Sequence, residues 1–203
     1  MKTRLAKDVG HDFAVSFYKV CAEHTFNEIL KLKENSIAPF LFCSDENEID
    51  EVKKWSNDKF RYYPQLGNDL GERMLNAFNK VFDEGYKKVI LVGTDVPGIN
   101  AKLISKALAH LENYDCVVGP SEDGGYYLIG LNSATPNLFD GISWSTDLVF
   151  SKTVETLETE NHSYLVLEKL IDVDTIDDLK KWRNNNKSLI SNSVKEILES
   201  FNV

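Results

Sequence analysis

Short apolar runs alternate with longer segments of helical periodicity along most of the 203-residue chain. The clearest run covers residues 88–92, and its β-branched side chains are typical of a strand that is buried on both faces of a sheet. The clearest helix begins at the capping-box pair Asp69 and Glu72 and ends at Gly85, with apolar residues on one face. Strands that alternate with helices predict an α/β fold, in which helices cover both faces of a mostly parallel sheet.

The predicted elements form one domain over residues 1–183. We expect helices over residues 11–34, 47–55, 69–85, 101–111, 146–160 and 176–182, and strands over residues 38–43, 60–64, 88–92, 115–119, 126–131 and 163–167. Residues 184–203 are expected to add an amphipathic helix, because Ile190, Val194, Ile197 and Phe201 share one face. That helix either packs against its own domain or forms a homodimer contact.

The charge of the chain limits its partners. Its 23 Lys and Arg residues against 32 Asp and Glu residues give a net charge of −9, which disfavours general binding to nucleic acid or anionic lipid. A cation or a metal-bridged phosphate suits this charge better. Cys21, Cys43 and Cys116 lie far apart in apolar stretches, so we expect buried thiols in a reducing compartment. Without an apolar run of about 18 residues or a signal-peptide core, a cytoplasmic protein is expected.

Carboxylates follow two of the predicted strands. Asp95 comes directly after residues 88–92, where a carboxylate is well placed to bind Mg²⁺ or Mn²⁺ carried by a diphosphate. Asp172 and Asp174 follow the last strand and point the same way on an extended chain, so Asp174 is expected as a second metal ligand. The alternatives are that Asp95 forms a turn and that Asp174 or Thr175 only caps the next helix.

A second acidic pair stands between two predicted strands. Glu122 and Asp123 precede Gly124 and Gly125, and neighbouring like charges repel unless a cation or a substrate hydroxyl lies between them. A hairpin turn that uses Asp-Gly is the alternative.

Two further segments suit an anionic ligand. Gly67 and Asn68 bring backbone amides to a helix start, with Arg73 one turn inside, although a well-capped core helix explains part of this pattern. Lys2 and Arg4 make a basic start to an acidic chain, for which a solvated terminus is the alternative.

The segment at residues 144–146 precedes a predicted helix. Ser145 or Thr146 is expected as its N-cap, and Trp144 could form a ring-stacking wall. His24 and His110 are expected on helix surfaces, because the four histidines share no metal-ligand spacing.

Six sequence blocks together resemble the small bacterial GT-A-type glycosyltransferases associated with arsenosugar biosynthesis. The blocks are residues 2–6 (KTRLA), 67–74 (GNDLGERM), 93–97 (GTDVP), 119–127 (GPSEDGGYY), 144–146 (WST) and 172–175 (DVDT). The resemblance extends from residue 2 to about residue 182. It implies a Rossmann-like nucleotide-diphospho-sugar transferase fold, a divalent metal on Asp95 and Asp174 with Asp172 second, and diphosphate binding by Lys2 and Arg4.

The chain departs from this family pattern at its start. Family members carry a first strand and a K-x-P-x-x-G loop before the KTR block, whereas here Met1 directly precedes Lys2. We therefore expect a sheet without its central strand, which leaves unpaired backbone groups along two neighbouring strands.

The leading functional hypothesis is a glycosyltransferase that moves a sugar from a nucleotide diphosphate to a small-molecule acceptor. Asp123, or Glu122 beside it, is the candidate that orients or deprotonates the acceptor hydroxyl. Donor binding is expected from Lys2, Arg4, Gly67, Asn68, Arg73, Gly124 and Gly125. The alternatives are a nucleotidyltransferase that uses the same metal site and releases pyrophosphate, and a non-catalytic binding protein that has lost its nucleotide loop.

Overall fold

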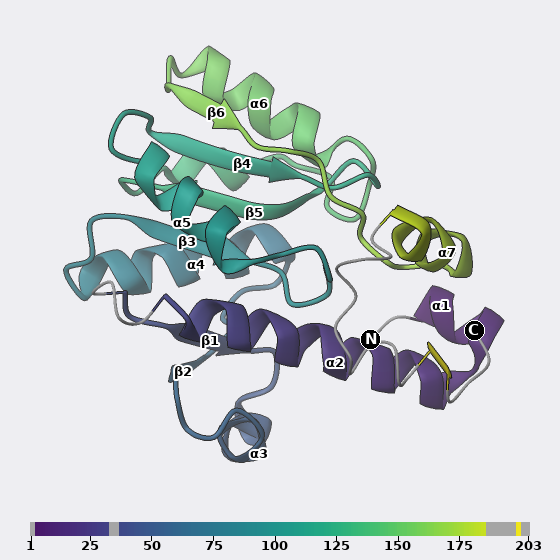
Figure 1. Ribbon diagram of the computed structural model, residues 1–203. Coiled ribbons are helices and arrows are strands. Elements are labelled where there is room, and N and C mark those ends of the chain that lie inside the picture. The colour runs from purple at the N-terminus through teal and green to yellow at the C-terminus, as the bar shows by residue number, and fades with distance from the viewer. Residues whose placement is uncertain (1–2, 33–36, 186–197, 200–203) are drawn as a thin grey trace.

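The computed structural model describes residues 3–32, 37–185 and 198–199, and it has the expected α/β architecture (Figure 1). Its helices are α1 (Thr3–Val9), α2 (His11–Leu30), α3 (Ile49–Trp55), α4 (Leu70–Asp83), α5 (Ala101–His110), α6 (Val149–Thr159) and α7 (Ile176–Asn185). Its strands are β1 (Phe40–Cys43), β2 (Arg61–Pro64), β3 (Val89–Val92), β4 (Cys116–Pro120), β5 (Tyr126–Leu131) and β6 (Tyr164–Val166). Short 3-10 helices cover Glu46–Glu48 and Pro136–Phe139.

The described strands form a two-stranded sheet and a four-stranded sheet. β1 and β2 pair in parallel, and the larger sheet has the order β3-β5-β4-β6. β5 runs antiparallel to both of its neighbours, whereas β6 is parallel to β4. Therefore β3, β4 and β6 point in one direction and β5 opposes them, which confirms a mostly parallel arrangement.

Four of the described strands, β1, β2, β3 and β6, have one strand partner each. β1 pairs with β2 and β3 pairs with β5 within the described ranges. The rings of Phe40 and Tyr86, at the starts of β1 and β3, contact each other with centroids 5.4 Å apart. That a central strand is missing from the sheet stays a prediction.

β3 lies at one edge of the four-stranded sheet, and its side chains are only partly buried. Val89 and Leu91 pack into a cluster with α4, whereas Ile90 and Val92 pack into a cluster with α5, so helices cover both faces. All four side chains nevertheless keep partial exposure, while all five residues of β4 are buried. The expectation of a strand covered on both faces is therefore confirmed, although β3 is only partly buried and has a strand neighbour on one side only in the described structure.

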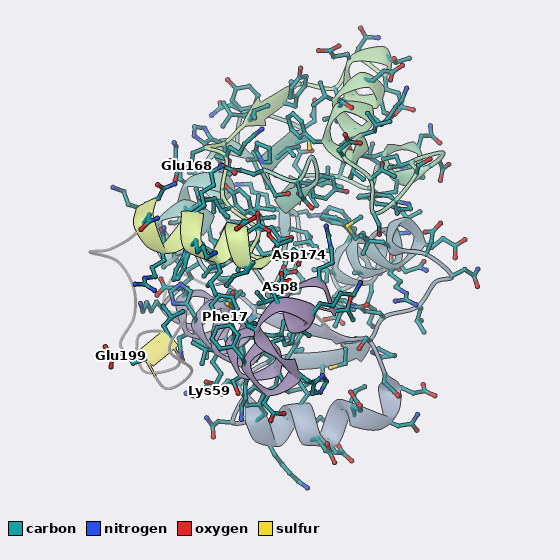
Figure 2. The ribbon with its side chains drawn as sticks, turned by 90° about the vertical axis from the view of Figure 1, so that its right-hand side faces the viewer. Asp8, Phe17, Lys59, Glu168, Asp174 and Glu199 are labelled. Atoms are coloured by element: carbon teal, nitrogen blue, oxygen red, sulfur yellow. The ribbon has the colours of Figure 1, made fainter. Side chains whose placement is uncertain are left out.

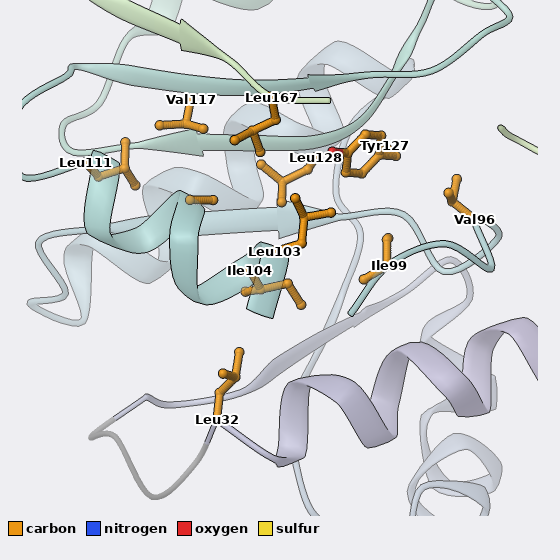
Figure 3. Close-up of a cluster of buried hydrophobic side chains, with 11 residues drawn as sticks. Leu32, Val96, Ile99, Leu103, Ile104, Leu111, Val117, Tyr127, Leu128 and Leu167 are labelled. Carbon is orange, nitrogen blue, oxygen red and sulfur yellow. The ribbon is translucent and has the colours of Figure 1, made fainter. Parts of the chain in front are cut away.

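Figure 3 shows the hydrophobic core between α5 and the larger sheet. Leu103 of α5 and Leu111 just after it are at most 4% exposed and pack with Val117 of β4 and Leu128 of β5. Leu32, just after α2, joins the same cluster. Burying each of these side chains contributes about 1.5–3 kcal/mol, so this cluster holds the strand ends that carry the candidate site in fixed positions.

Helix α4 begins as its sequence predicts. The Asp69 carboxylate accepts a hydrogen bond from the Glu72 amide at 2.9 Å, which confirms the N-cap. Glu72 reaches back and accepts from the Asn68 amide at 2.8 Å. The helix ends at Asp83, shortly before Gly85.

Two helix starts differ from the sequence predictions. Residues 3–9 form a short helix that the sequence reading missed, and its Leu5 is fully buried beside Phe13 and Trp182. Helix α6 begins at Val149 rather than at residue 146, with Leu148 as N-cap and no side-chain cap. The predicted cap at Ser145 or Thr146 was wrong, because the Thr146 hydroxyl donates to the Ser143 carbonyl within the preceding turn.

The prediction of buried thiols is confirmed, and the C-terminal prediction remains open. Cys21, Cys43 and Cys116 are free and buried, and burial followed by the charge of Asp115 raises the pKa of Cys116 to about 12. Most of the predicted C-terminal helix lies outside the described residues. Leu198, which is described, is 6% exposed and belongs to the cluster around Leu5.

Candidate metal and nucleotide site

Three carboxylates from two distant segments come together at one edge of the molecule. Asp95, Asp172 and Asp174 each offer one oxygen, and these oxygens lie within 4.8 Å of one another. Figure 2 shows Asp174 on the side where α1 and α7 meet. The structure therefore brings together the two predicted metal ligands, Asp95 and Asp174, with Asp172 as the third member of this acidic cluster.

Asp95 is placed by the end of β3. The Gly93 amide donates to the Tyr127 carbonyl at 3.0 Å, which continues the pairing with β5 one residue past β3. Val96 is 2% exposed and fixes the chain just after Asp95. The loop is therefore held on both sides of the Asp95 carboxylate.

The other two carboxylates flank a buried valine. Val173 is fully buried in the cluster that contains Leu5 and Leu179. Because side chains alternate along an extended chain, Asp172 and Asp174 both point away from that core. Both are partly exposed.

Thr175 caps the start of α7, which was the alternative interpretation of this segment. The Thr175 hydroxyl accepts from the Asp178 amide at 3.2 Å, and the Asp178 carboxylate accepts from the Thr175 amide at 2.8 Å. Thr175 and Asp178 thus form a reciprocal capping pair at the start of α7. The carboxylate of Asp174 lies in the acidic cluster.

The donor set of the acidic cluster fits a small, hard divalent cation. Mg²⁺ and Mn²⁺ prefer carboxylate oxygens, and in an octahedral Mg²⁺ site adjacent ligands lie about 3 Å apart and opposite ligands about 4 Å apart. The three oxygens of the cluster lie within 4.8 Å of one another, which is near the longer of these spacings. Three neighbouring carboxylates also repel one another unless positive charge is present.

Arg4 supplies positive charge at this cluster. Its guanidinium Nη2 donates to Asp174 Oδ2 at 2.5 Å. The sequence assigned Arg4 to a diphosphate, and the structure places it directly beside the predicted metal ligands. Lys2 lies outside the described residues.

The loop at residues 121–125 lies beside the segment that leads to Asp172. The Glu122 amide donates to the Leu170 carbonyl at 3.0 Å. Asp123 Oδ1 accepts from the Ser121 hydroxyl at 2.5 Å and from the Gly125 amide at 3.0 Å, so Asp123 forms the turn that the alternative interpretation described. The Glu122 carboxylate accepts a hydrogen bond from Lys181 of α7.

The loop at residues 67–73 uses its polar groups to hold its own shape. Arg73 Nε donates to the Gly67 carbonyl at 3.1 Å, and the Asn68 side chain donates to Glu72 at 2.9 Å. Arg73 is partly buried and Asn68 is exposed. The helix-start interpretation is therefore confirmed, and ligand binding by these residues stays a prediction.

Two close contacts connect these loops through residues 144–150. A Cβ added at Gly71 would lie 2.6 Å from the Trp144 ring, and one added at Gly124 would lie 2.2 Å from the Asp147 carbonyl oxygen. The Phe150 amide donates to the Gly124 carbonyl at 2.8 Å. The loops at residues 67–73, 121–125 and 144–150 thus form one continuous wall.

Two residues of α2, Tyr18 and His24, contact the loop that carries Asp95. No sequence pattern could have identified these two contacts. The Tyr18 hydroxyl hydrogen-bonds with the Thr94 hydroxyl at 3.1 Å, directly beside Asp95. His24 Nε2 lies 2.7 Å from the Ile99 carbonyl oxygen. His24, which was expected on a helix surface, is partly buried because α2 packs against the loop after β3.

The fold and the acidic cluster together define the class: an α/β protein with the nucleotide-diphospho-sugar transferase fold. A crystal structure from Desulfovibrio desulfuricans G20, provisionally described as a nucleotide-diphospho-sugar transferase, has a TM-score of 0.89 and 34% sequence identity to this chain. The similarity covers 100% of this chain and 89% of that chain.

Within that class the chain belongs to the DUF2064 family, described as uncharacterized proteins conserved in bacteria, whose model matches residues 29–146. The chain is also similar to two curated proteins named 2-phospho-L-lactate guanylyltransferase. The protein from Methanocaldococcus jannaschii is 29% identical over 60% of this chain and 55% of its own length. The protein from Methanocaldococcus fervens is 31% identical over 64% of this chain and 59% of its own length. This chain thus spans less than two thirds of each of these relatives.

None of the described helices is long and apolar enough to cross a membrane.

Proposed function

We propose that this protein is a metal-dependent transferase that moves a sugar from a nucleotide diphosphate to a small-molecule acceptor. The observation that carries the proposal is the acidic cluster of Asp95, Asp172 and Asp174. It lies after the strand end of β3 and after β6, where open α/β sheets bind their ligands. The similarity to the Desulfovibrio structure supports the same class of reaction.

The metal site has a defined role in this proposal. Asp95 and Asp174, with Asp172 beside them, would hold Mg²⁺ or Mn²⁺. When bound, the ion would supply positive charge that stabilises the departing diphosphate. Arg4, and Lys2 from its neighbouring position in the sequence, would bind the phosphate oxygens with charge-assisted hydrogen bonds.

The wall of loops would hold the donor and the acceptor. Gly67, Asn68 and Arg73 belong to the loop at residues 67–73, and Gly124 contacts Asp147, with Gly125 next to it in the chain. In this proposal these five residues line the nucleotide-sugar subsite.

The acceptor hydroxyl would be oriented or deprotonated by Asp123 or by Glu122. Asp123 Oδ1 accepts two hydrogen bonds within the turn, so its Oδ2 is the atom that we assign to the acceptor. Glu122 is paired with Lys181, and it would need to leave that contact to act as a base. Asp123 is therefore the first choice of the two.

Calorimetric titration tests the metal assignment. The wild-type protein and the Asp95→Asn variant are titrated with UDP- and GDP-sugars in the presence of Mn²⁺. We expect the binding heat to be lost in Asp95→Asn and retained in Asp83→Asn, which removes an exposed carboxylate from the end of α4. Equal heats for the wild type and Asp95→Asn would contradict the assignment.

A nucleotidyltransferase activity is the second candidate, because both curated relatives are named as guanylyltransferases. The same acidic cluster would then hold the metal on a nucleoside triphosphate, and pyrophosphate would leave. Incubation with each nucleoside triphosphate and a set of phosphorylated small molecules, followed by a pyrophosphate assay, separates the two reactions. Pyrophosphate release that depends on Asp95 would favour nucleotidyl transfer over sugar transfer.

Three finer parts of the proposal rest on the sequence. They are an association with arsenosugar biosynthesis, from the family resemblance, a cytoplasmic location, from the lack of a membrane-length apolar run, and a homodimer, from the apolar face expected over residues 184–203. Gel filtration with light scattering tests the last of these directly.

A further inference from the structure

The positively charged side chain of Arg4 lies against the acidic cluster. Its guanidinium contacts Asp174 at 2.5 Å, and Asp174 is one of the three carboxylates whose oxygens lie within 4.8 Å of one another. A guanidinium that contacts Asp174 and a divalent ion that binds Asp174 use the same carboxylate. The two cations therefore compete.

The backbone on each side of this contact is fixed by neighbouring buried residues. Leu5, next to Arg4, and Val173, next to Asp174, are both fully buried in the same cluster. The Arg4 side chain is 64% exposed, whereas that of Asp174 is 24% exposed. The guanidinium can thus swing into solvent while α1 and the Asp174 backbone stay in place.

We propose that Arg4 is a built-in counter-cation of Asp174, which neutralises the acidic cluster before metal binding and which a divalent cation must displace. This inference rests on the proposed metal site. It assigns to Arg4 a role in setting the metal affinity, in addition to any contact with substrate phosphates. In this proposal a divalent cation binds Asp174 only as the Arg4 guanidinium leaves it.

The expected effect is moderate, because the ion pair is exposed to solvent. Exposed ion pairs change an equilibrium by no more than about fivefold. Removing Arg4 is therefore expected to lower the dissociation constant for Mn²⁺ by about threefold to fivefold. Removing a positive charge elsewhere on α1 changes the affinity for Mn²⁺ only through screened, longer-range electrostatics, so its effect is smaller.

Mn²⁺ titration followed by electron paramagnetic resonance measures this affinity without substrate. Arg4→Gln is compared with the wild type and with Lys7→Gln, which removes an exposed positive charge from the same helix. We expect tighter Mn²⁺ binding in Arg4→Gln and a change of less than about 1.5-fold in Lys7→Gln. Equal gains in the two variants would overturn the inference, because the effect would then be general charge and not the contact.

A double-mutant cycle tests whether the effect passes through Asp174. In an Asp172→Asn background, Arg4→Gln should still tighten Mn²⁺ binding. In an Asp174→Asn background, the gain should vanish, and its persistence would overturn the inference. Unchanged Mn²⁺ affinity in Arg4→Gln would overturn this inference alone, whereas a wild-type protein that binds no Mn²⁺ would overturn the proposed metal site as well.

Discussion

Single residues around the site are determined by close contacts that leave little room for substitution. Gly71 faces the ring of Trp144, and Gly124 faces the backbone of Asp147 while its φ of 90° disfavours other residues. The GNDLGERM and EDGG blocks therefore contain glycines for packing between loops. The sequence predicted loops with backbone amides at these places, but the partners Trp144 and Asp147 could not be predicted, because they come from a third segment.

Substituting Gly71 tests this packing. Gly71→Ala would place a Cβ 2.6 Å from the Trp144 ring, so the ring or helix α4 must shift. Overpacking of this kind costs about 1–3 kcal/mol, and we expect a melting temperature lower by several degrees. Gly98→Ala is the matched control, since its Cβ would meet Leu170 at an ordinary distance of 3.4 Å. Equal melting temperatures for the two variants would refute the packing role of Gly71.

A second residue-scale prediction concerns pH. Burial raises the pKa of Glu28, but hydrogen bonds from Lys31 and from the Ala101 amide lower it by more, so the net pKa lies below 4.5. A lowered pKa in the folded state contributes stability above the ordinary pKa, and this contribution is lost as the pH falls through the folded-state value. Glu28→Gln should therefore cost about 1 kcal/mol at pH 7 and progressively less below pH 4.5.

Urea unfolding at pH 7, 4.5 and 3 measures this difference. Glu51→Gln, which changes an exposed glutamate of α3, serves as the control. A stability difference for Glu28→Gln that stayed constant from pH 7 to pH 3 would contradict the prediction.

At the scale of elements, the sequence predicts what depends on local periodicity. The alternation of strands and helices, the cap at Asp69 and the approach of Asp95 to Asp174 all follow from patterns within short segments and from the rule that strand ends share one edge. Helix α1 could not be predicted, since seven residues carry little periodicity and its stability depends on the burial of Leu5. The pairing of Glu122 with Lys181 also depends on where α7 packs.

The cap of α7 connects helix stability to the site. Thr175→Ala removes the hydroxyl that caps α7 and should cost about 1 kcal/mol. Because Asp174 directly precedes this cap, we also expect about tenfold weaker Mn²⁺ binding, as is typical when groups behind metal ligands are removed. Asp69→Ala is the control, since it removes the cap of α4 at a similar cost in stability but should leave Mn²⁺ binding unchanged. Wild-type Mn²⁺ affinity in Thr175→Ala would show that the cap does not position Asp174.

At the scale of the whole molecule, the site depends on how distant segments meet. The acidic cluster needs β3, the segment before α7 and helix α1 at one edge, and one hydrophobic cluster joins Leu5, Phe17, Val173 and Trp182 beneath it. The sequence marks each of these residues as apolar but cannot say that they share a cluster, because that depends on the packing of α1, α2 and α7. Stability of this cluster is therefore expected to affect the site as well as the fold.

Leu198 tests how the C-terminal residues join this cluster. It is 6% exposed and packs with Leu5 and Phe13, so we expect Leu198→Ala to cost about 2–5 kcal/mol through the lost contacts and the cavity that remains. Val15→Ala is the control, because Val15 is 39% exposed and its truncation should cost much less. Thermal unfolding and light scattering are measured together. If the C-terminal helix packs against its own domain, Leu198→Ala lowers the melting temperature at unchanged mass, whereas loss of a dimer would show that the helix serves a contact between two copies. A melting temperature equal to that of Val15→Ala would contradict the buried position of Leu198.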